Sequence, residues 1–251
     1  MKSIFHEKRL PAADRASLLR RILDRARASA AAGACPVVVF DLDGTLIDNR
    51  PRVVAILHEL GEHWRERHPE AAANCRAATV DKIGYSVVDN LKRLGIHQDW
   101  LYEEGMDFWK ARFFTDDYQA HDVELPGALA FAKACHDLGA LLVYLTGRDL
   151  PGMALGTFKS LRDLGFPIGT MGAKLVTKPA FDIPDTEFKQ SVAGEIGRFG
   201  EVIAVFDNEP ANCNLLLAAY PACDSVFVDS QHAPDPPDLD PRVHVIDTFE
   251  M

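Results

Sequence analysis

Short apolar runs alternate with helical patterns along most of this sequence. Pro36–Phe40 is a continuous run rich in β-branched residues, which is typical of a strand buried on both faces of a parallel sheet. Similar runs cover residues 140–145, 171–176, 202–206 and 226–228, and a last short one covers 243–246. Between them lie apolar residues at helical spacing, such as Phe188, Val192 and Ile196. The pattern predicts an open α/β core, with a mostly parallel sheet flanked by helices.

Residues 49–122 interrupt this alternation. They hold three sets of apolar residues at helical spacing and no buried-strand run, so they are predicted to form an all-helical insertion. The α/β core then comprises residues 34–48 and 123–251. Residues 1–33 place apolar positions at helical spacing among arginines and predict an amphipathic N-terminal helix, which either docks on the core or joins two copies of the chain.

Composition and charge narrow the class of protein. The 251 residues are 47% hydrophobic and 25% charged, which are ordinary globular values. The formal net charge of -10 argues against nucleic acid as a partner, because phosphate backbones bind clustered Lys and Arg. The five cysteines are scattered and form no C-x-x-C pair, which argues against a disulfide scaffold and a structural zinc site. No apolar run approaches membrane-spanning length and no signal segment opens the chain, so we expect a cytoplasmic protein with no membrane partner.

Two carboxylates stand where the first predicted strand ends. In a strand, Asp41 and Asp43 share one side, and Gly44 permits a sharp exit that points both at one ligand. Ligands of open α/β folds bind at the carboxyl ends of strands, and a hard cation would neutralise two adjacent carboxylates. The alternative is an ordinary turn after a strand, where Asp and Gly are common.

The segment 38–48, VVFDLDGTLID, resembles the first motif of the haloacid dehalogenase-like hydrolases, a family with a Rossmann-like fold. The resemblance implies three further motifs, each at a later strand end. Thr146, followed by Gly147, matches the second, and Asp207 matches the acidic fourth. Lys189 is preferred for the third motif, with Lys178 as the alternative. Many relatives have two successive acids in the fourth motif, whereas Asn208 and Glu209 follow Asp207 in this chain, and Glu209 would either join the metal site or favour the start of the next helix.

By the same resemblance, the chain hydrolyses a small phosphate monoester with Mg²⁺ through an aspartyl-phosphate. Asp41 attacks phosphorus, and Asp43 starts protonated, its pKa raised by the neighbouring carboxylate, and serves as general acid and then base. Mg²⁺ would be held by the carboxylates of Asp41 and Asp207 and the main-chain carbonyl of Asp43, while Thr146, Gly147 and the lysine bind phosphate. Phosphoryl transfer by a phosphosugar mutase and non-catalytic binding of a phosphorylated ligand are the alternatives.

The helical insertion follows the first motif directly, where relatives carry a cap over the site. A cap predicts a small phosphorylated metabolite as substrate. Asn49, Arg50 and Arg52 lie just after the first motif and would either touch substrate or remain solvated charges at a helix start. Formation of a homodimer through the N-terminal helix or the cap is a further hypothesis.

Overall fold

One parallel sheet forms the centre of the molecule. The structure is a computed structural model that describes residues 3–251, and within that range six strands pair in the order β5-β4-β1-β6-β7-β8. Every pair in this sheet is parallel. The strands are β1 (Pro36–Phe40), β4 (Leu141–Asp149), β5 (Ala173–Lys178), β6 (Glu201–Asp207), β7 (Asp224–Val228) and β8 (His244–Ile246). The predicted α/β fold with a parallel sheet is confirmed.

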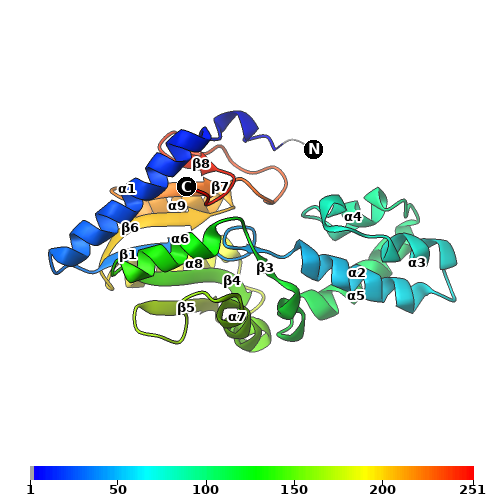
Figure 1. The fold of residues 1–251 in the computed structure, drawn as a ribbon. Coiled ribbons are helices and arrows are strands. Elements are labelled where there is room, and N and C mark those ends of the chain that lie inside the picture. The colour runs from blue at the N-terminus through cyan, green and yellow to red at the C-terminus, as the bar shows by residue number, and fades with distance from the viewer. Residues whose placement is uncertain (1–2) are drawn as a thin grey trace.

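Helices cover both faces of the sheet (Figure 1). On one face lie α1 (Ala12–Ala31), α6 (Ala128–Asp137) and α7 (Leu150–Leu164), and on the other α8 (Asp185–Ile196) and α9 (Pro210–Ala219). Strand β1 shows why its sequence is apolar throughout, since Val38 and Phe40 pack into the first layer while Val37 and Val39 pack into the second.

Helix α1 covers one face of the core. Its stripe of Leu18, Leu19, Ile22 and Ala26 is buried in the same apolar cluster as the inner face of α6. The N-terminal helix therefore docks on the core, as one of the two sequence-based alternatives had it. Its apolar stripe is already covered, and self-association of the chain stays a prediction.

The helical insertion, residues 49–122, is called the cap below. It contains α2 (Arg50–Trp64), α3 (Pro69–Arg76), α4 (Val87–Arg93) and α5 (Asp99–Phe113), with 3-10 turns η2 (Val80–Lys82) and η3 (Asp117–His121). A separate apolar cluster around Leu57, Leu60 and Trp64 holds these helices together. The sequence pattern missed α3, and the helical pattern of residues 80–94 is split into η2 and α4.

A short antiparallel pair joins cap and core. Strand β2 (Ile47–Asp48) leads into the cap and β3 (Val123–Glu124) leads out of it, and the two strands pair side by side. In Figure 1 the cap, drawn in cyan to green, extends from one edge of the sheet, while α1 crosses the opposite part of the core. In the part of the chain that is described, no helix is both long and apolar enough to cross a membrane.

Candidate active site

A cavity of about 280 Å³ lies between the core and the cap. Its floor comes from the carboxyl ends of three adjacent strands, because Asp41 follows β1, Thr146 lies in β4 and Asp207 ends β6. Parallel strands present their carboxyl ends at one edge, so residues more than a hundred positions apart meet there. The predicted residues Asp41, Asp43, Thr146, Gly147, Lys178, Lys189 and Asp207 all line this cavity.

The turn after β1 requires glycine for two reasons. Gly44 has a φ of 78°, which favours glycine over other residues. A Cβ atom at Gly44 would also overlap the side chain of Asn208, which lies against the loop. The Gly44 N–H donates to the carbonyl of Ile47 at 2.7 Å and closes the turn. The Asp41 to Thr45 loop is thereby fixed against the loop that follows β6.

Asp41, Lys189 and Asp207 form a buried charge group, called the Lys189 cluster below. The Lys189 ammonium donates to Asp41 Oδ1 at 2.8 Å and to Asp207 Oδ2 at 2.6 Å. The side chains of all three are at least nine-tenths buried. Thr45 donates its hydroxyl to Asp41 Oδ2 at 3.0 Å, and Asn212 donates its amide to Asp207 Oδ1 at 3.2 Å. One lysine thus faces two carboxylates, which leaves one unit of negative charge.

Burial changes how these groups titrate. It raises the pKa of Asp41 to about 7, although the Lys189 ammonium works in the opposite direction. Burial alone would lower the pKa of Lys189, but attraction to Asp207 and Asp41 outweighs it, and its pKa lies above its usual value. The lysine therefore stays charged, and Asp41 is a carboxylate that a further positive charge would stabilise.

The donor chemistry of the Lys189 cluster fits Mg²⁺. In the described chain, no group of three or more His, Cys, Asp or Glu side chains is arranged to hold a metal ion. Mg²⁺ does not need one, since it is commonly held by one or two carboxylates together with substrate phosphate and water. Asp41 and Asp207 supply two oxygen ligands and a surplus negative charge, and neither Cys nor His is among the cavity residues that are described.

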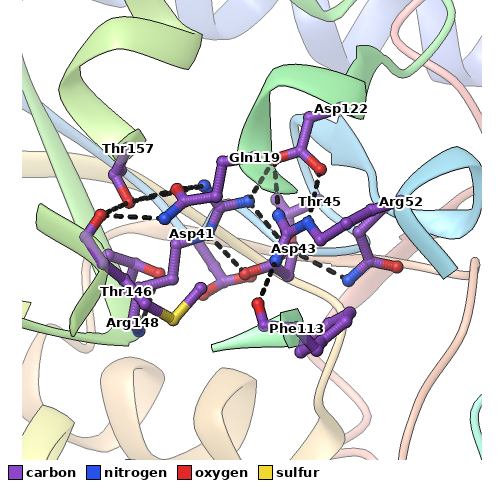
Figure 2. Close-up of polar contacts among 12 residues, drawn as sticks. Asp41, Asp43, Thr45, Arg52, Phe113, Gln119, Asp122, Thr146, Arg148 and Thr157 are labelled. Atoms are coloured by element: carbon purple, nitrogen blue, oxygen red, sulfur yellow. Dashed lines mark hydrogen bonds and ion pairs between the residues drawn. The ribbon is translucent and has the colours of Figure 1, made fainter. Parts of the chain in front are cut away.

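Asp43 belongs to a second group, the Arg148 cluster, formed with Arg148, Asp122 and Arg52 (Figure 2). Arg148 donates to both oxygens of Asp43, each at 2.7 Å, and to Asp122 Oδ2 at 2.8 Å. Arg52 donates to both oxygens of Asp122, including the Oδ2 atom that Arg148 also contacts, and reaches Asp43 at 3.4 Å. Two arginines and two aspartates make this cluster electrically neutral.

The Arg148 cluster corrects one expectation about Asp43. We expected a neighbouring carboxylate to raise its pKa and keep it protonated. Burial does act in that direction, but the Arg148 guanidinium outweighs it, and the pKa of Asp43 lies well below its usual range. In this arrangement Asp43 is an ionised carboxylate.

Arg148 is also held from behind. Its Nη1 donates to the side-chain oxygen of Gln119 at 2.6 Å, and Thr157 donates to the same oxygen at 2.7 Å. Figure 2 shows Gln119 and Thr157 beside Arg148, on the side away from Asp43. Since Gln119 lies in η3 of the cap and Thr157 in α7 of the core, the position of Arg148 depends on how the two parts meet.

The two candidate lysines have different surroundings. Lys189 lies in the Lys189 cluster, whereas Lys178 pairs with Asp185 at 2.8 Å and has no contact with Asp41. Gly147 allows Asp185 to approach, because a Cβ at Gly147 would overlap the Asp185 carboxylate. Thr146 is buried, and its hydroxyl oxygen accepts the backbone N–H of Arg148 at 3.2 Å, which leaves the hydroxyl proton available for a ligand.

Residues near the fourth motif hold loops in place. The Asn208 amide donates to the carbonyl of Gln231, and Glu209 accepts the backbone N–H of Ala233 at 2.9 Å. Glu209 is the N-cap residue of α9, but its side chain makes no capping hydrogen bond. Asn212 orients Asp207, a role that the sequence did not reveal, although it stands five residues later at the start of α9.

The three polar residues singled out after the first motif have different contacts in the structure. Asn49 donates to Asp43 Oδ1 at 3.1 Å and lines the cavity. Arg50 pairs with Asp48. Arg52 is fully buried against Asp122 and does not line the cavity, so neither expectation for it, substrate contact or a solvated charge, is correct.

Comparison with known families decides the class of protein. Residues 35–212 match the model of the haloacid dehalogenase-like hydrolases, and this span covers most of the chain. The chain belongs to the haloacid dehalogenase-like hydrolase family. The resemblance drawn from the motifs is therefore confirmed, and the protein is a hydrolase. Hydrolases of this family generally use Mg²⁺.

Solved structures show the same fold at low sequence identity. A provisionally named phosphatase from Clostridium difficile is 15% identical, with a TM-score of 0.56, over 84% of this chain and 94% of that one. A protein from Haemophilus somnus 129PT, described as a predicted phosphoglycolate phosphatase, is 15% identical, with a TM-score of 0.50, over 85% of this chain and 94% of that one. A search of the curated proteins finds no match.

Proposed function

We propose that this hydrolase cleaves small phosphate monoesters in a Mg²⁺-dependent reaction with Asp41 as the nucleophile. The observation that carries the proposal is the contact of Lys189 with both Asp41 and Asp207 at the floor of the cavity, at 2.8 and 2.6 Å. A fixed ammonium beside the attacking carboxylate stabilises the charge that develops on the transferred group. The phosphatase names of two proteins with this fold agree with the proposal.

In the first step, a carboxylate oxygen of Asp41 attacks phosphorus and the bond from phosphorus to the ester oxygen breaks. The products are an aspartyl-phosphate and an alcohol, which takes its proton from Asp43 or from water. Thr45, which donates to Asp41 Oδ2 at 3.0 Å, keeps the carboxylate turned so that its other oxygen faces Lys189. Thr146 and the N–H of Gly147 would donate hydrogen bonds to the phosphoryl oxygens.

In the second step, water attacks the phosphorus of the aspartyl-phosphate. Asp43 accepts the proton of that water, the bond from phosphorus to Asp41 breaks, and phosphate leaves. An ionised Asp43 is ready for this role as base. To act first as an acid, Asp43 must take up a proton and give up Arg148, so a rearrangement of the Arg148 cluster would accompany the first step with poor leaving groups.

The residues that would hold Mg²⁺ are Asp41 and Asp207, with the main-chain carbonyl of Asp43. When bound, the ion supplies positive charge that offsets the surplus carboxylate of the Lys189 cluster and the charge of the phosphate. The substrate partner is a small phosphorylated metabolite, because the cap encloses the cavity on the side where the leaving group would lie.

The test is release of phosphate from p-nitrophenyl phosphate by the full-length chain, with Mg²⁺ and with EDTA. We expect release only with Mg²⁺. The Asp41→Asn variant should lose at least about a thousandfold in rate while still folding, as a cooperative thermal unfolding transition would show. Asp107→Asn, which changes an exposed aspartate on α5, is the matched control and should retain full activity.

Two outcomes would contradict the proposal. Retained turnover in Asp41→Asn would remove Asp41 from the role of nucleophile. Absence of metal-dependent release from p-nitrophenyl phosphate and from a panel of sugar phosphates, nucleotides and phospho-amino acids would remove phosphatase activity altogether.

A further inference from the structure

The cap side of the cavity carries no charge. Eight cap residues line the cavity in the described chain, and none is Asp, Glu, Lys, Arg or His. Four of them are aromatic: Tyr85, Trp109, Phe113 and Phe114. The cap faces the leaving group of a substrate whose phosphate lies on the core floor, so the leaving group meets an uncharged wall.

The cations of the cavity are already paired. Lys189 faces Asp41 and Asp207, Arg148 faces Asp43, and Lys178 faces Asp185 at 2.8 Å. Throughout residues 3–251, no other Lys or Arg lines the cavity, whereas five carboxylates do. These carboxylates would repel a second anionic group on the substrate. That group would also find no unpaired cation in the cavity, and burying an unpaired charge is costly.

The aromatic residues form a continuous row from cap to core. Ring centroids are 4.5 Å apart between Trp109 and Phe113, 5.0 Å between Phe113 and Phe114, and 4.8 Å between Phe114 and Phe181. Phe181 belongs to the core loop after β5. The row therefore bridges the opening between the two parts of the molecule.

Two rings at this cavity remain exposed. Phe181 is 57% exposed and Tyr85, on the cap, is 55% exposed, although both line the cavity. Burial of an aromatic side chain is strongly favourable, and its flat face stacks well on another ring. These two rings contribute little to the apolar core, so their surface is available to a ligand.

We infer that the natural substrates are phosphate monoesters of uncharged alcohols that carry an aromatic ring. The inference rests on the proposed phosphatase function and specifies its substrate class. A cavity of about 280 Å³ lies at the small end of ligand pockets, which suits a compact ring better than a long chain. The class excludes carboxylated or doubly phosphorylated leaving groups, and it sets this chain apart from the phosphoglycolate activity named for one protein of the same fold.

The substrate test compares four esters with Mg²⁺ and the full-length enzyme. Benzyl phosphate and cyclohexylmethyl phosphate have leaving groups of similar size, of which only benzyl is flat and aromatic. Ethyl phosphate lacks the ring, and phosphoglycolate carries a carboxylate. We expect kcat/KM to be highest for benzyl phosphate, by about two- to tenfold over cyclohexylmethyl phosphate, and lowest for phosphoglycolate.

The variant test uses the two exposed rings. Phe181→Ala and Tyr85→Ala should each lower kcat/KM for benzyl phosphate by about two- to tenfold and leave that for ethyl phosphate unchanged. Trp100→Ala is the matched control, because Trp100 is also on the cap and also 55% exposed but does not line the cavity. Trp100→Ala should leave kcat/KM unchanged for both benzyl phosphate and ethyl phosphate.

The outcomes separate this inference from the proposed function. Preferred hydrolysis of phosphoglycolate, or equal losses for benzyl and ethyl phosphate in both variants, would overturn the aromatic substrate class while phosphatase activity stands. If p-nitrophenyl phosphate is not hydrolysed either, the proposed function fails. Calorimetric titration of Asp41→Asn with Mg²⁺ and either benzyl phosphate or ethyl phosphate then still tests the substrate class. If benzyl phosphate binds no more tightly than ethyl phosphate, the aromatic substrate class is overturned.

Discussion

Asp41 and Asp43 stand two residues apart, yet they lie in buried charge clusters of opposite character. Asp41 shares one lysine with Asp207, so its cluster keeps a negative surplus. Asp43 belongs to a cluster of two arginines and two aspartates, which is neutral. Burial raises the pKa of Asp41 to about 7, whereas Arg148 overcomes burial and lowers that of Asp43.

The two aspartates of the first motif are therefore suited to different roles. The Lys189 cluster lies within the core, and its surplus charge suits it to receive a cation and a phosphoryl group. The Arg148 cluster contains residues of both cap and core, so it links the state of Asp43 to their contact. Each of the following experiments changes one side of this comparison.

The largest effect is expected from Lys189→Met, which leaves Asp41 and Asp207 buried without a cation. Activity should fall by about a thousandfold. The free energy of unfolding in EDTA should drop by about 3 to 5 kcal/mol, as measured by urea unfolding, and Mg²⁺ should restore part of it. If Lys189→Met unfolds in EDTA with the same free energy as the wild type, the charge of this cluster does not affect stability.

Asp43→Asn should reduce activity according to the leaving group. An alcohol that leaves poorly needs a proton, so hydrolysis of benzyl phosphate should fall by about a hundredfold or more. p-Nitrophenolate leaves without one, so in single-turnover measurements the first step with p-nitrophenyl phosphate should be affected far less. Equal losses of that step for both esters would contradict a role for Asp43 as the general acid.

Arg148→Met should destabilise the protein by about 3 kcal/mol, because it removes both hydrogen bonds of Arg148 to Asp43 and one of the three side-chain hydrogen bonds to Asp122. Arg52 still pairs with Asp122, which makes the loss smaller than at Lys189. The double variant Arg148→Met with Asp43→Asn should cost less than the sum of the single variants, as chemical denaturation would reveal. Strict additivity would mean that the two residues do not interact.

The smallest effect is a pH dependence of opposite sign in the two clusters. The folded-state pKa of Asp41 is raised from 3.8 to about 7, so its contribution to stability in EDTA falls as the pH rises through that window. The pKa of Asp43 is lowered, so its contribution is present above 3.8 and is lost as the pH falls below that value. The stability of the wild type relative to Asp41→Asn and to Asp43→Asn, followed by urea unfolding from pH 3 to 8, should show these two trends, and parallel trends would contradict the comparison.

The buried strands could be predicted because both of their faces pack against helices. Strand β1 matches its predicted run, and β6 and β7 extend theirs by one or two residues at the ends. Helix α3 was missed, since it buries only small side chains, Ala71, Ala72 and Cys75, which give no clear period. Strand β5 begins at Ala173 because Gly172 has a φ of 84° and Met171 is 93% exposed.

The candidate site also has one part that the sequence indicated, the Lys189 cluster, and one part that it did not, the Arg148 cluster. The residues of the Lys189 cluster lie at strand ends or in the first half of a helix, so the order of motifs along the chain brought them to attention. The Arg148 cluster depends on Arg52 and Asp122, which are 70 positions apart and belong to no local pattern. Both belong to the cap, and they meet only when the start of α2 and the end of the cap come together in the fold, a geometry that has no signal in a single sequence.

The β2 and β3 pair has a consequence for how such a molecule can change over evolutionary time. The chain leaves the core at Asp48 and returns at Val123, and these two residues are direct partners in the pair. Relative to the core, the whole intervening segment is a loop whose two ends are held together. The entropic cost of closing such a loop grows only slowly with its length. Segments of different size and surface could therefore be exchanged at this junction without altering the register of the sheet, and an exchange that spares Asn49, Arg52, Gln119 and Asp122 would preserve the support of Asp43.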